Sequence, residues 1–272
     1  MWGVFAVAFV LAALGCAWAG RKALELYDTE IRRPLIVFLA LTAVWAVSNI
    51  LVIAPVPLFV MHASYIVGLI VGFSTVVVWL WFCSAYAGTP YHYNRRVQAL
   101  ALGVTGAITL LKLTNPLHEL YFRPAIASVP FRHFAPETGV LYWLVATLAY
   151  IGAAIGLYIL FDVYASSDLE TSSVVVLTAL IGLPVVPKLL AIARPNTMVL
   201  LFYEPLGAAI FAIGITTVAQ DTFLSVRAPA RRQLANRLSE IIIVVDQHDR
   251  IAEYNDSAAA VFDGLAGALG AP

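Results

Sequence analysis

The chain has 272 residues, of which 61% are hydrophobic and only 12% carry a charged side chain, and its mean hydropathy is +0.88. Soluble domains are about half apolar and about a quarter charged, so this composition predicts a protein whose main solvent is lipid. The zero formal net charge and the two cysteines, both in apolar runs, exclude a generally basic nucleic-acid-binding protein and a disulfide scaffold.

Long, mostly apolar runs predict seven membrane-spanning helices, because about 20 apolar residues cross about 30 Å of hydrocarbon. The spans are expected at residues 2–20, 34–53, 60–86, 97–114, 140–161, 173–193 and 198–219. Pro55 and Pro57 separate the second span from the third within an uncharged stretch that covers residues 34–94. The predicted fold class is therefore an all-α membrane protein, a bundle of seven transmembrane helices.

The distribution of basic residues predicts the orientation of this bundle. With the N-terminus outside, ten basic residues lie on the inner side: Arg21, Lys22, Arg32, Arg33, Arg95, Arg96, Arg227, Arg231, Arg232 and Arg237. The outer loops then carry only Arg123, Arg132 and Arg194. Because Lys and Arg accumulate in cytoplasmic loops, we expect a multi-pass protein of the cell membrane with an extracytoplasmic N-terminus and a cytoplasmic C-terminus.

The first predicted span has one competing interpretation. Ala17-Trp18-Ala19 matches the small-residue pattern at which a signal peptide is cleaved. A signal peptide, however, begins with a basic segment, whereas here the basic pair Arg21-Lys22 follows the apolar run. A membrane-spanning helix is therefore the favoured interpretation.

The hydropathy falls after Gln220, and the sequence of the tail predicts two further units. Residues 220–240 are expected to contain a juxtamembrane signalling helix, which Pro229 can open. Leu234, Leu238 and Ile241 form a narrow apolar stripe along it, which suits a helix pair and predicts a homodimer.

Residues 241–272 are expected to begin a small cytoplasmic α/β domain. The β-branched run 241–246 and the alternating run 250–254 predict a β-hairpin, and Asn255 can cap a short helix that ends at Phe262. So few residues cannot bury a complete core, so this domain is expected to be incomplete. The predicted organisation is a membrane domain at 1–219, a linker helix at 220–240 and this unit at 241–272.

Charged and polar residues inside the spans indicate a candidate site, because a charge in hydrocarbon is costly and is a functional hypothesis by default. In the predicted topology these residues share the outer third of the bundle. We predict a ligand-binding pocket lined by Asn49, His62, Lys112, Asn115, His118, Lys188 and Glu204. The remaining depth is apolar, and Gly68, Gly72, Gly103, Gly106, Gly152 and Gly156 are expected to be close-packing positions.

Glu204 is expected six residues into the last span, roughly 9 Å deep, and its short side chain cannot reach the interface. Lys188 is its expected partner, because only residues 194–197 join the last two spans. A structural ion pair remains an equal alternative to a ligand site. Lys112 and Lys188 have a further alternative, in which lysines near helix ends extend their amines to the interface and have no other role.

Several chemistries lack their sequence signatures. We find no glycine-rich phosphate loop, no nucleophile elbow and no His-x-x-x-His pattern, so no catalytic residue, metal or cofactor is predicted. A retinal-binding photoreceptor would need a lysine in the middle of the last span, and 198–219 contains none. A small membrane transporter or enzyme would be favoured by paired acids or an inverted repeat. These two classes are kept as alternatives.

Two segments carry a resemblance to known proteins. The run 241–262, IIIVVDQHDRIAEYNDSAAAVF, resembles the opening of a PAS domain, which begins with a hairpin ending in Asn and a short helix. The segment TNPLHELYF (114–122) is similar to the Asn-x-x-His motif of the N-terminal seven-transmembrane sensor region of archaeal and bacterial histidine kinases, with Asn115 and His118 as the pair.

The resemblance implies the input module of a two-component histidine kinase rather than kinase activity within these residues. Such a module would be a dimer in the lipid membrane. It would relay an extracytoplasmic or intramembrane stimulus through the juxtamembrane helix to cytoplasmic PAS and kinase domains, and from there to a response regulator.

Overall fold

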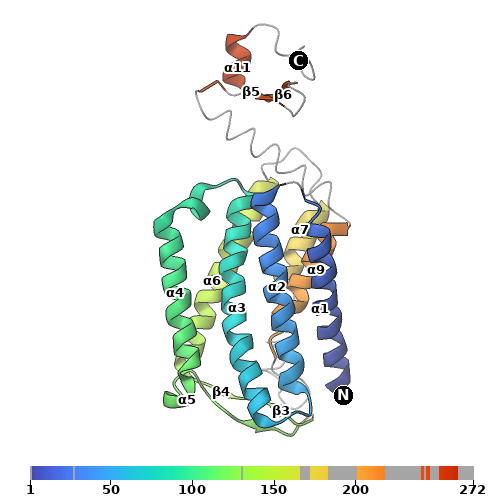
Figure 1. Cartoon of the computed structure of the whole chain (residues 1–272), viewed down its shortest axis with the longest axis vertical. Coiled ribbons are helices and arrows are strands. Elements are labelled where there is room, and N and C mark those ends of the chain that lie inside the picture. Colours follow the sequence, from blue (N-terminus) through green and yellow to red (C-terminus); the bar gives the residue numbers. More distant parts are fainter. Residues whose placement is uncertain are drawn as a thin grey trace.

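The computed structural model describes residues 2–26, 28–129, 131–165, 172–182, 201–217, 240–241, 243–245 and 251–262. In this part of the chain, five helices are long and apolar enough to cross a membrane: α1 (Trp2–Ala23), α2 (Thr29–Ile53), α3 (Leu58–Tyr86), α4 (Arg95–Leu113) and α6 (Val140–Ala165). They agree closely with the first five predicted spans, and successive helices run in opposite directions (Figure 1).

Local signals explain where these helices begin and end. Asp28 caps α2, since its carboxylate accepts a hydrogen bond from the Glu30 amide at 2.9 Å. The turn around Pro55 separates α2 from α3, and a 3-10 turn, η1 (Pro90–Tyr93), leads into α4. Asn94 then caps α4 by accepting from the Arg96 amide at 2.9 Å. Proline and polar capping residues thus mark the boundaries between α2, α3 and α4.

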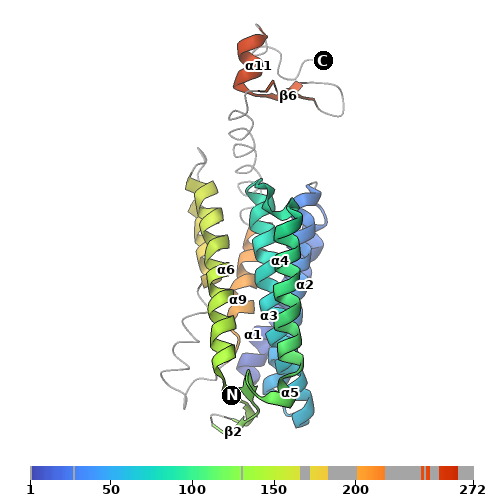
Figure 2. The same cartoon turned by 90° about the vertical axis from the view of Figure 1, so that its left-hand side faces the viewer.

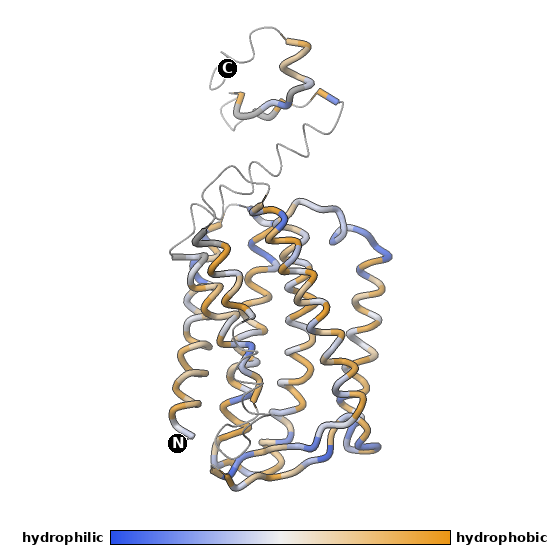
Figure 3. Tube along the Cα trace, turned by 180° about the vertical axis from the view of Figure 1, so that it is seen from behind, coloured by the Kyte–Doolittle hydropathy of each residue, from blue (hydrophilic) through white to orange (hydrophobic). Residues whose placement is uncertain are grey.

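The centre of the bundle is formed by α1, α2 and α3, together with α9 (Glu204–Thr217), which packs against α1 and α2. Figure 2 shows α9 between α6 and these first three helices. α4 lies at the edge, where it packs on α3 and buries only Ile108 and Lys112. Apolar residues cover the length of the helices and polar residues gather at both ends (Figure 3), as expected for a bundle surrounded by lipid.

The sixth and seventh predicted spans are described only in part. α7 (Ser172–Ala179) and the 3-10 turn η2 (Leu180–Gly182) represent the sixth span, and α9 represents the seventh. The other residues of these two spans lie outside the described part of the chain, so the number seven stays a prediction. The last span does not run as one helix through residue 204, because 201–203 are not helical and α9 begins at Glu204.

This late helix start has a local cause. Pro205 lies in the first turn of α9, where a missing amide hydrogen does no harm. Its ring disfavours a helical conformation of the preceding residue, which opposes extension of the helix toward residue 201. We refer to residues 201–203 as the helix break.

The loop between α4 and α6 is ordered by a short helix and two small antiparallel ladders. The helix is α5 (Asn115–His118); β1 (Phe122–Arg123) pairs with β4 (Glu137–Thr138), and β2 (Ile126–Ala127) pairs with β3 (His133–Phe134). This loop lies at the same end of the bundle as the N-terminus (Figure 1).

The C-terminal elements follow the predicted order of hairpin and helix. β5 (Ile243–Val245) pairs with β6 (Ile251–Tyr254), and α11 (Asp256–Val261) follows. Asn255 caps α11 by accepting from the Ala258 amide at 3.0 Å, and its side-chain amide donates to the Glu240 carbonyl at 2.7 Å. The predicted juxtamembrane helix at 230–239 lies outside the described residues.

Close packing is confirmed for four of the six glycines named above. A Cβ on Gly72 would lie 2.7 Å from Cζ2 of Trp45, and one on Gly68 would lie 2.8 Å from the Ser48 hydroxyl. Gly152 and Gly156 meet α3 side chains in the same way. The expectation is wrong for Gly103 and Gly106, which would meet nothing within 4 Å because α4 lies at the edge of the bundle.

We expect Gly72→Ala to destabilise the protein by about 1–3 kcal/mol, because the rigid Trp45 ring cannot move away from an added methyl group. Gly103→Ala is the matched control in α4, and it should be neutral or slightly stabilising since alanine is the better helix former. Thermal unfolding of both variants in detergent, followed by circular dichroism, measures the difference. Equal melting temperatures would contradict the close contact between α2 and α3.

Candidate functional site

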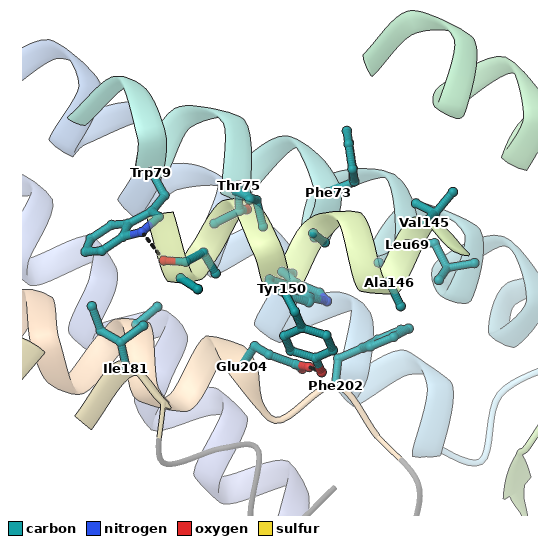
Figure 4. A pocket seen from close by; sticks show the side chains of 18 of the residues that line it. Leu69, Phe73, Thr75, Trp79, Val145, Ala146, Tyr150, Ile181, Phe202 and Glu204 are labelled. Carbon is teal, nitrogen blue, oxygen red and sulfur yellow. Dashed lines mark hydrogen bonds between the residues drawn. The ribbon is translucent and has the colours of Figure 1, made fainter. Parts of the chain in front are cut away.

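A cavity of about 250 Å³ lies between α3 and α6 and extends to α2, η2 and the start of α9. Its walls are mostly aliphatic and aromatic. Along α3 it reaches from Leu69 to Trp79, about 15 Å at 1.5 Å per residue. Figure 4 shows Trp79 and Ile181 toward one end, Leu69 and Val145 toward the other, and Tyr150, Glu204 and Phe202 between them.

Lys112 is the buried cation of this cavity. Its side chain comes from the last turn of α4 and is only 1% exposed, so it does not extend to the membrane surface. The ammonium donates to the Leu69 carbonyl at 2.7 Å and lies 5.2 Å and 5.6 Å from the ring centroids of Phe73 and Tyr121. One carbonyl and two aromatic faces therefore surround a charge that is expensive to bury.

Glu204 is the acidic group that lines the same cavity. It is the first residue of α9, and the positive end of a helix dipole stabilises a carboxylate there. The Tyr150 hydroxyl of α6 donates to its Oε1 at 2.8 Å, which links the two helices directly (Figure 4). Helix position and hydrogen bonding together explain how this carboxylate is accommodated within the bundle.

Asn49 stabilises the helix break. Its side chain is 1% exposed, and its amide donates to the Phe202 carbonyl at 3.0 Å and to the Trp45 carbonyl at 3.2 Å. Non-helical backbone inside a membrane needs protein partners, because no water is available there. The Tyr203 carbonyl is satisfied in turn by the Leu206 amide at 3.0 Å. Asn49 thus has a structural role beside the cavity rather than in its lining.

Trp45 adds a donor that the sequence did not suggest. The side chain lines the cavity and is 8% exposed, and its buried Nε1–H has no hydrogen-bond partner among the residues that the structure describes. Its ring centroid lies 5.9 Å from that of Phe202, beside the helix break. Tyr121, Tyr142 and Tyr150 also line the cavity and were not predicted as site residues. For Tyr142 and Tyr150, the signal available in the sequence was a hydroxyl group within the fifth predicted span.

Asn115 and His118 shape the turn that leads into β1. The Asn115 carbonyl oxygen accepts from the amides of Tyr121 and Phe122 at 2.9 and 3.2 Å, and its amide donates to the Phe122 carbonyl at 2.8 Å. His118 accepts from the Leu120 amide at 3.1 Å through Nδ1. Glu119, which follows His118, adopts a left-handed conformation with φ of 50°. The pair holds the loop in place and does not line the cavity.

His62 belongs to an aromatic cluster that connects this loop to the helix break. The cluster consists of His62, Tyr65, Phe122, Phe134 and Phe202. Tyr65 is central, with ring centroids 4.9 Å from Phe122, 5.4 Å from Phe134 and 5.5 Å from Phe202. Through Tyr65, rings at β1 and β3 are therefore connected to Phe202, two residues before α9.

The predicted site residues thus separate into groups. Lys112 and Glu204 line one cavity. Asn49 on α2 contacts the helix break, and His62 on α3 belongs to the aromatic cluster. Asn115 and His118 lie in the loop between α4 and α6. Lys188 and its predicted pairing with Glu204 lie outside the described residues. Within the described ranges, no group of three or more His, Cys, Asp or Glu side chains is placed to hold a metal ion.

These features define a polytopic helical membrane protein with a mostly apolar internal site. A family model described as the N-terminal seven-transmembrane region of histidine kinase matches residues 3–223, and the chain belongs to that family. The family points to a membrane sensory module of histidine kinases. A comparison with curated proteins found no match.

We expect Asn49→Leu to lower the free energy of unfolding by about 1–3 kcal/mol, because the buried Phe202 carbonyl loses its donor. Thr42→Val is the matched control on the same helix: the Thr42 hydroxyl donates only to the Phe38 carbonyl of its own helix, and valine preserves its shape. Denaturant titration in mixed micelles compares the two. If Thr42→Val lowers the free energy of unfolding as much as Asn49→Leu does, the hydrogen bond from Asn49 to the Phe202 carbonyl contributes no more than a hydrogen bond within one helix.

Proposed function

We propose that this chain is the sensory input module of a two-component histidine kinase, with seven spans, an extracytoplasmic N-terminus and a cytoplasmic C-terminus. Family membership and five apolar helices support the class. The orientation is supported by the arrangement of the basic residues. Lys22, Arg32 and Arg95 lie near helix ends that are opposite the loop containing β1–β4 (Figure 1).

The helix break is the observation that carries the proposed mechanism. Phe202, within the break, lines the cavity and belongs to the aromatic cluster. α9 begins directly after the break at Glu204, which also lines the cavity. A stimulus that changes the cavity or the outer loop acts on the break through these contacts. α9 then tilts or shifts against α1 and α2, because a break absorbs such motion more readily than a continuous helix does.

The shift of α9 reaches the output through residues 220–240, proposed as the juxtamembrane signalling helix and the dimer contact. The next unit, 241–272, is proposed as the beginning of a PAS domain. The hairpin of β5 and β6, followed by Asn255 as the cap of α11, supports this assignment. Kinase domains and a response regulator would act downstream. Disulfide crosslinking of a cysteine introduced at Leu234 tests the dimer, and a strictly monomeric product would oppose it.

Accessibility labelling tests the topology in a variant with Cys16 and Cys83 replaced by alanine. A cysteine at Ser128 should react with a membrane-impermeant maleimide added to intact cells. A cysteine at Asp28, between α1 and α2, should react only after the membrane is permeabilised. Labelling of the Asp28 position in intact cells, or protection of the Ser128 position, would reverse or reject the proposed orientation.

Substitution of Glu204→Gln separates a signalling role from a structural one in the chain joined to a histidine kinase output module. We expect a severalfold change in autophosphorylation in membrane vesicles, with a melting temperature close to that of the unsubstituted protein. The reason is that glutamine keeps an acceptor for Tyr150 but removes the charge beside the break. Glu25→Gln is the control, since Glu25 forms an exposed pair with Lys22. Lower stability with normal autophosphorylation would instead identify a structural carboxylate.

A further inference from the structure

The cavity is polar toward one end and apolar toward the other. Lys112, at the level of Leu69 on α3, contributes a buried ammonium group. Ten residues further along α3, Trp79 is 3% exposed and its indole N–H already donates to the Ala153 carbonyl at 3.3 Å. The Phe38 ring lies tilted beside Trp79, with ring centroids 5.7 Å apart, so this second end presents aromatic carbon to the cavity.

The polar part contains donors that lack acceptors. An ammonium group has three N–H donors, and the Leu69 carbonyl takes up one of those on Lys112. Lys112 has no carboxylate partner: the ion pairs within the described ranges are Lys22–Glu25 and Arg123–Glu119. The Trp45 indole N–H is buried and has no acceptor in the described part of the chain. Buried donors without acceptors are destabilising, so this end of the cavity is suited to a ligand that brings acceptor oxygens.

Small side chains create the space between these ends. α6 contributes Ala146, Ala149, Ala153 and Ala154 to the wall, opposite Gly68 and Gly72 of α3. A volume of about 250 Å³ is slightly below the range of about 300–1,000 Å³ that is usual for ligand pockets. The cavity is therefore too small for a two-chain lipid, and its length of about 15 Å along α3 suits a single extended chain.

We propose that the cavity binds a medium-chain alkyl carboxylate, with the carboxylate at Lys112 and Trp45 and the end of the chain at Trp79. This inference rests on the proposed sensory function, for which such an amphiphile would be the stimulus. The carboxylate supplies both a negative charge for the ammonium and oxygen acceptors for the unpaired donors. In the cavity, the alkyl chain of the ligand exchanges its contacts with membrane lipid for contacts with Val76, Ala153 and Leu157 of the apolar walls. Glu204 also lines the cavity, but within the described residues its carboxylate accepts from Tyr150 of α6 and not from Lys112.

Bromine quenching of tryptophan fluorescence tests both the site and the orientation. The full chain in nanodiscs is titrated with dodecanoate brominated either at the last carbon or beside the carboxylate. We expect saturable quenching by both probes. Trp79→Phe should remove the saturable quenching by the probe brominated at the last carbon. Trp45→Phe should remove the saturable quenching by the probe brominated beside the carboxylate. Trp143→Phe is the control, because Trp143 is 49% exposed on α6 and should affect neither.

Substitutions that act on the two ends without removing the fluorophores complete the test. Lys112→Met should weaken saturable binding at least tenfold, whereas Lys22→Met on the surface should not change it. Ala149→Leu narrows the cavity without touching a charge and should abolish binding, whereas Ala107→Leu on the exposed side of α4 should leave it intact. Ala149→Leu therefore keeps the proposal testable if Lys112→Met does not fold.

Two outcomes would overturn the proposal. Quenching that rises linearly with the probe and is equal in Ala149→Leu would show partitioning into the bilayer without a site. Equal affinity for dodecanoate and its methyl ester would show that the site recognises a neutral carbonyl, and the carboxylate assignment would be wrong. Neither outcome affects the sensory function, because the Glu204→Gln comparison reads autophosphorylation with no added amphiphile.

Discussion

The structure depends on one constraint: inside a membrane, backbone amides and carbonyls must find their partners within the protein. Five helices meet it by their own hydrogen bonds, and the helix break at 201–203 does not. Asn49 supplies the missing donor to the Phe202 carbonyl from a neighbouring helix, and Tyr203 is satisfied by the first turn of α9. A single side chain on α2 therefore permits irregular backbone at the position where the cavity, the outer loop and α9 meet.

The same constraint explains why the polar residues of the bundle fall into two kinds. Asn49 and Asn115 each form two or more hydrogen bonds to backbone groups and act as fixed connections. Lys112 and Trp45 retain donors that the surrounding protein does not use. The two kinds thus differ in how many hydrogen bonds they form with backbone groups in the described part of the chain, although Asn49, Asn115 and Lys112 looked equivalent in the sequence as polar interruptions of apolar runs.

Much of the fold was predictable because lipid imposes a length on each span. The uncharged runs located the first five helices, and the β-branched run with Asn255 located the hairpin and helix near the C-terminus. Orientation within the bundle was not predictable in the same way. α3 and α6 are apolar on every side, so their sequences do not reveal which face meets a neighbour. Tyr150 on α6 was missed for this reason, and Gly103 was assigned to a contact that α4 does not make.

The position of Pro205 has a consequence for the kind of motion available to this protein. A break held only by side-chain hydrogen bonds could in principle close, turning the last span into one continuous helix in a second state. Pro205 opposes that state, because in a continuous helix it could donate no amide hydrogen to the Leu201 carbonyl and its ring would clash with that carbonyl. Residues 201–203 therefore stay non-helical when α9 moves, and the motion available at this position is a tilt of α9 rather than a transition from coil to helix.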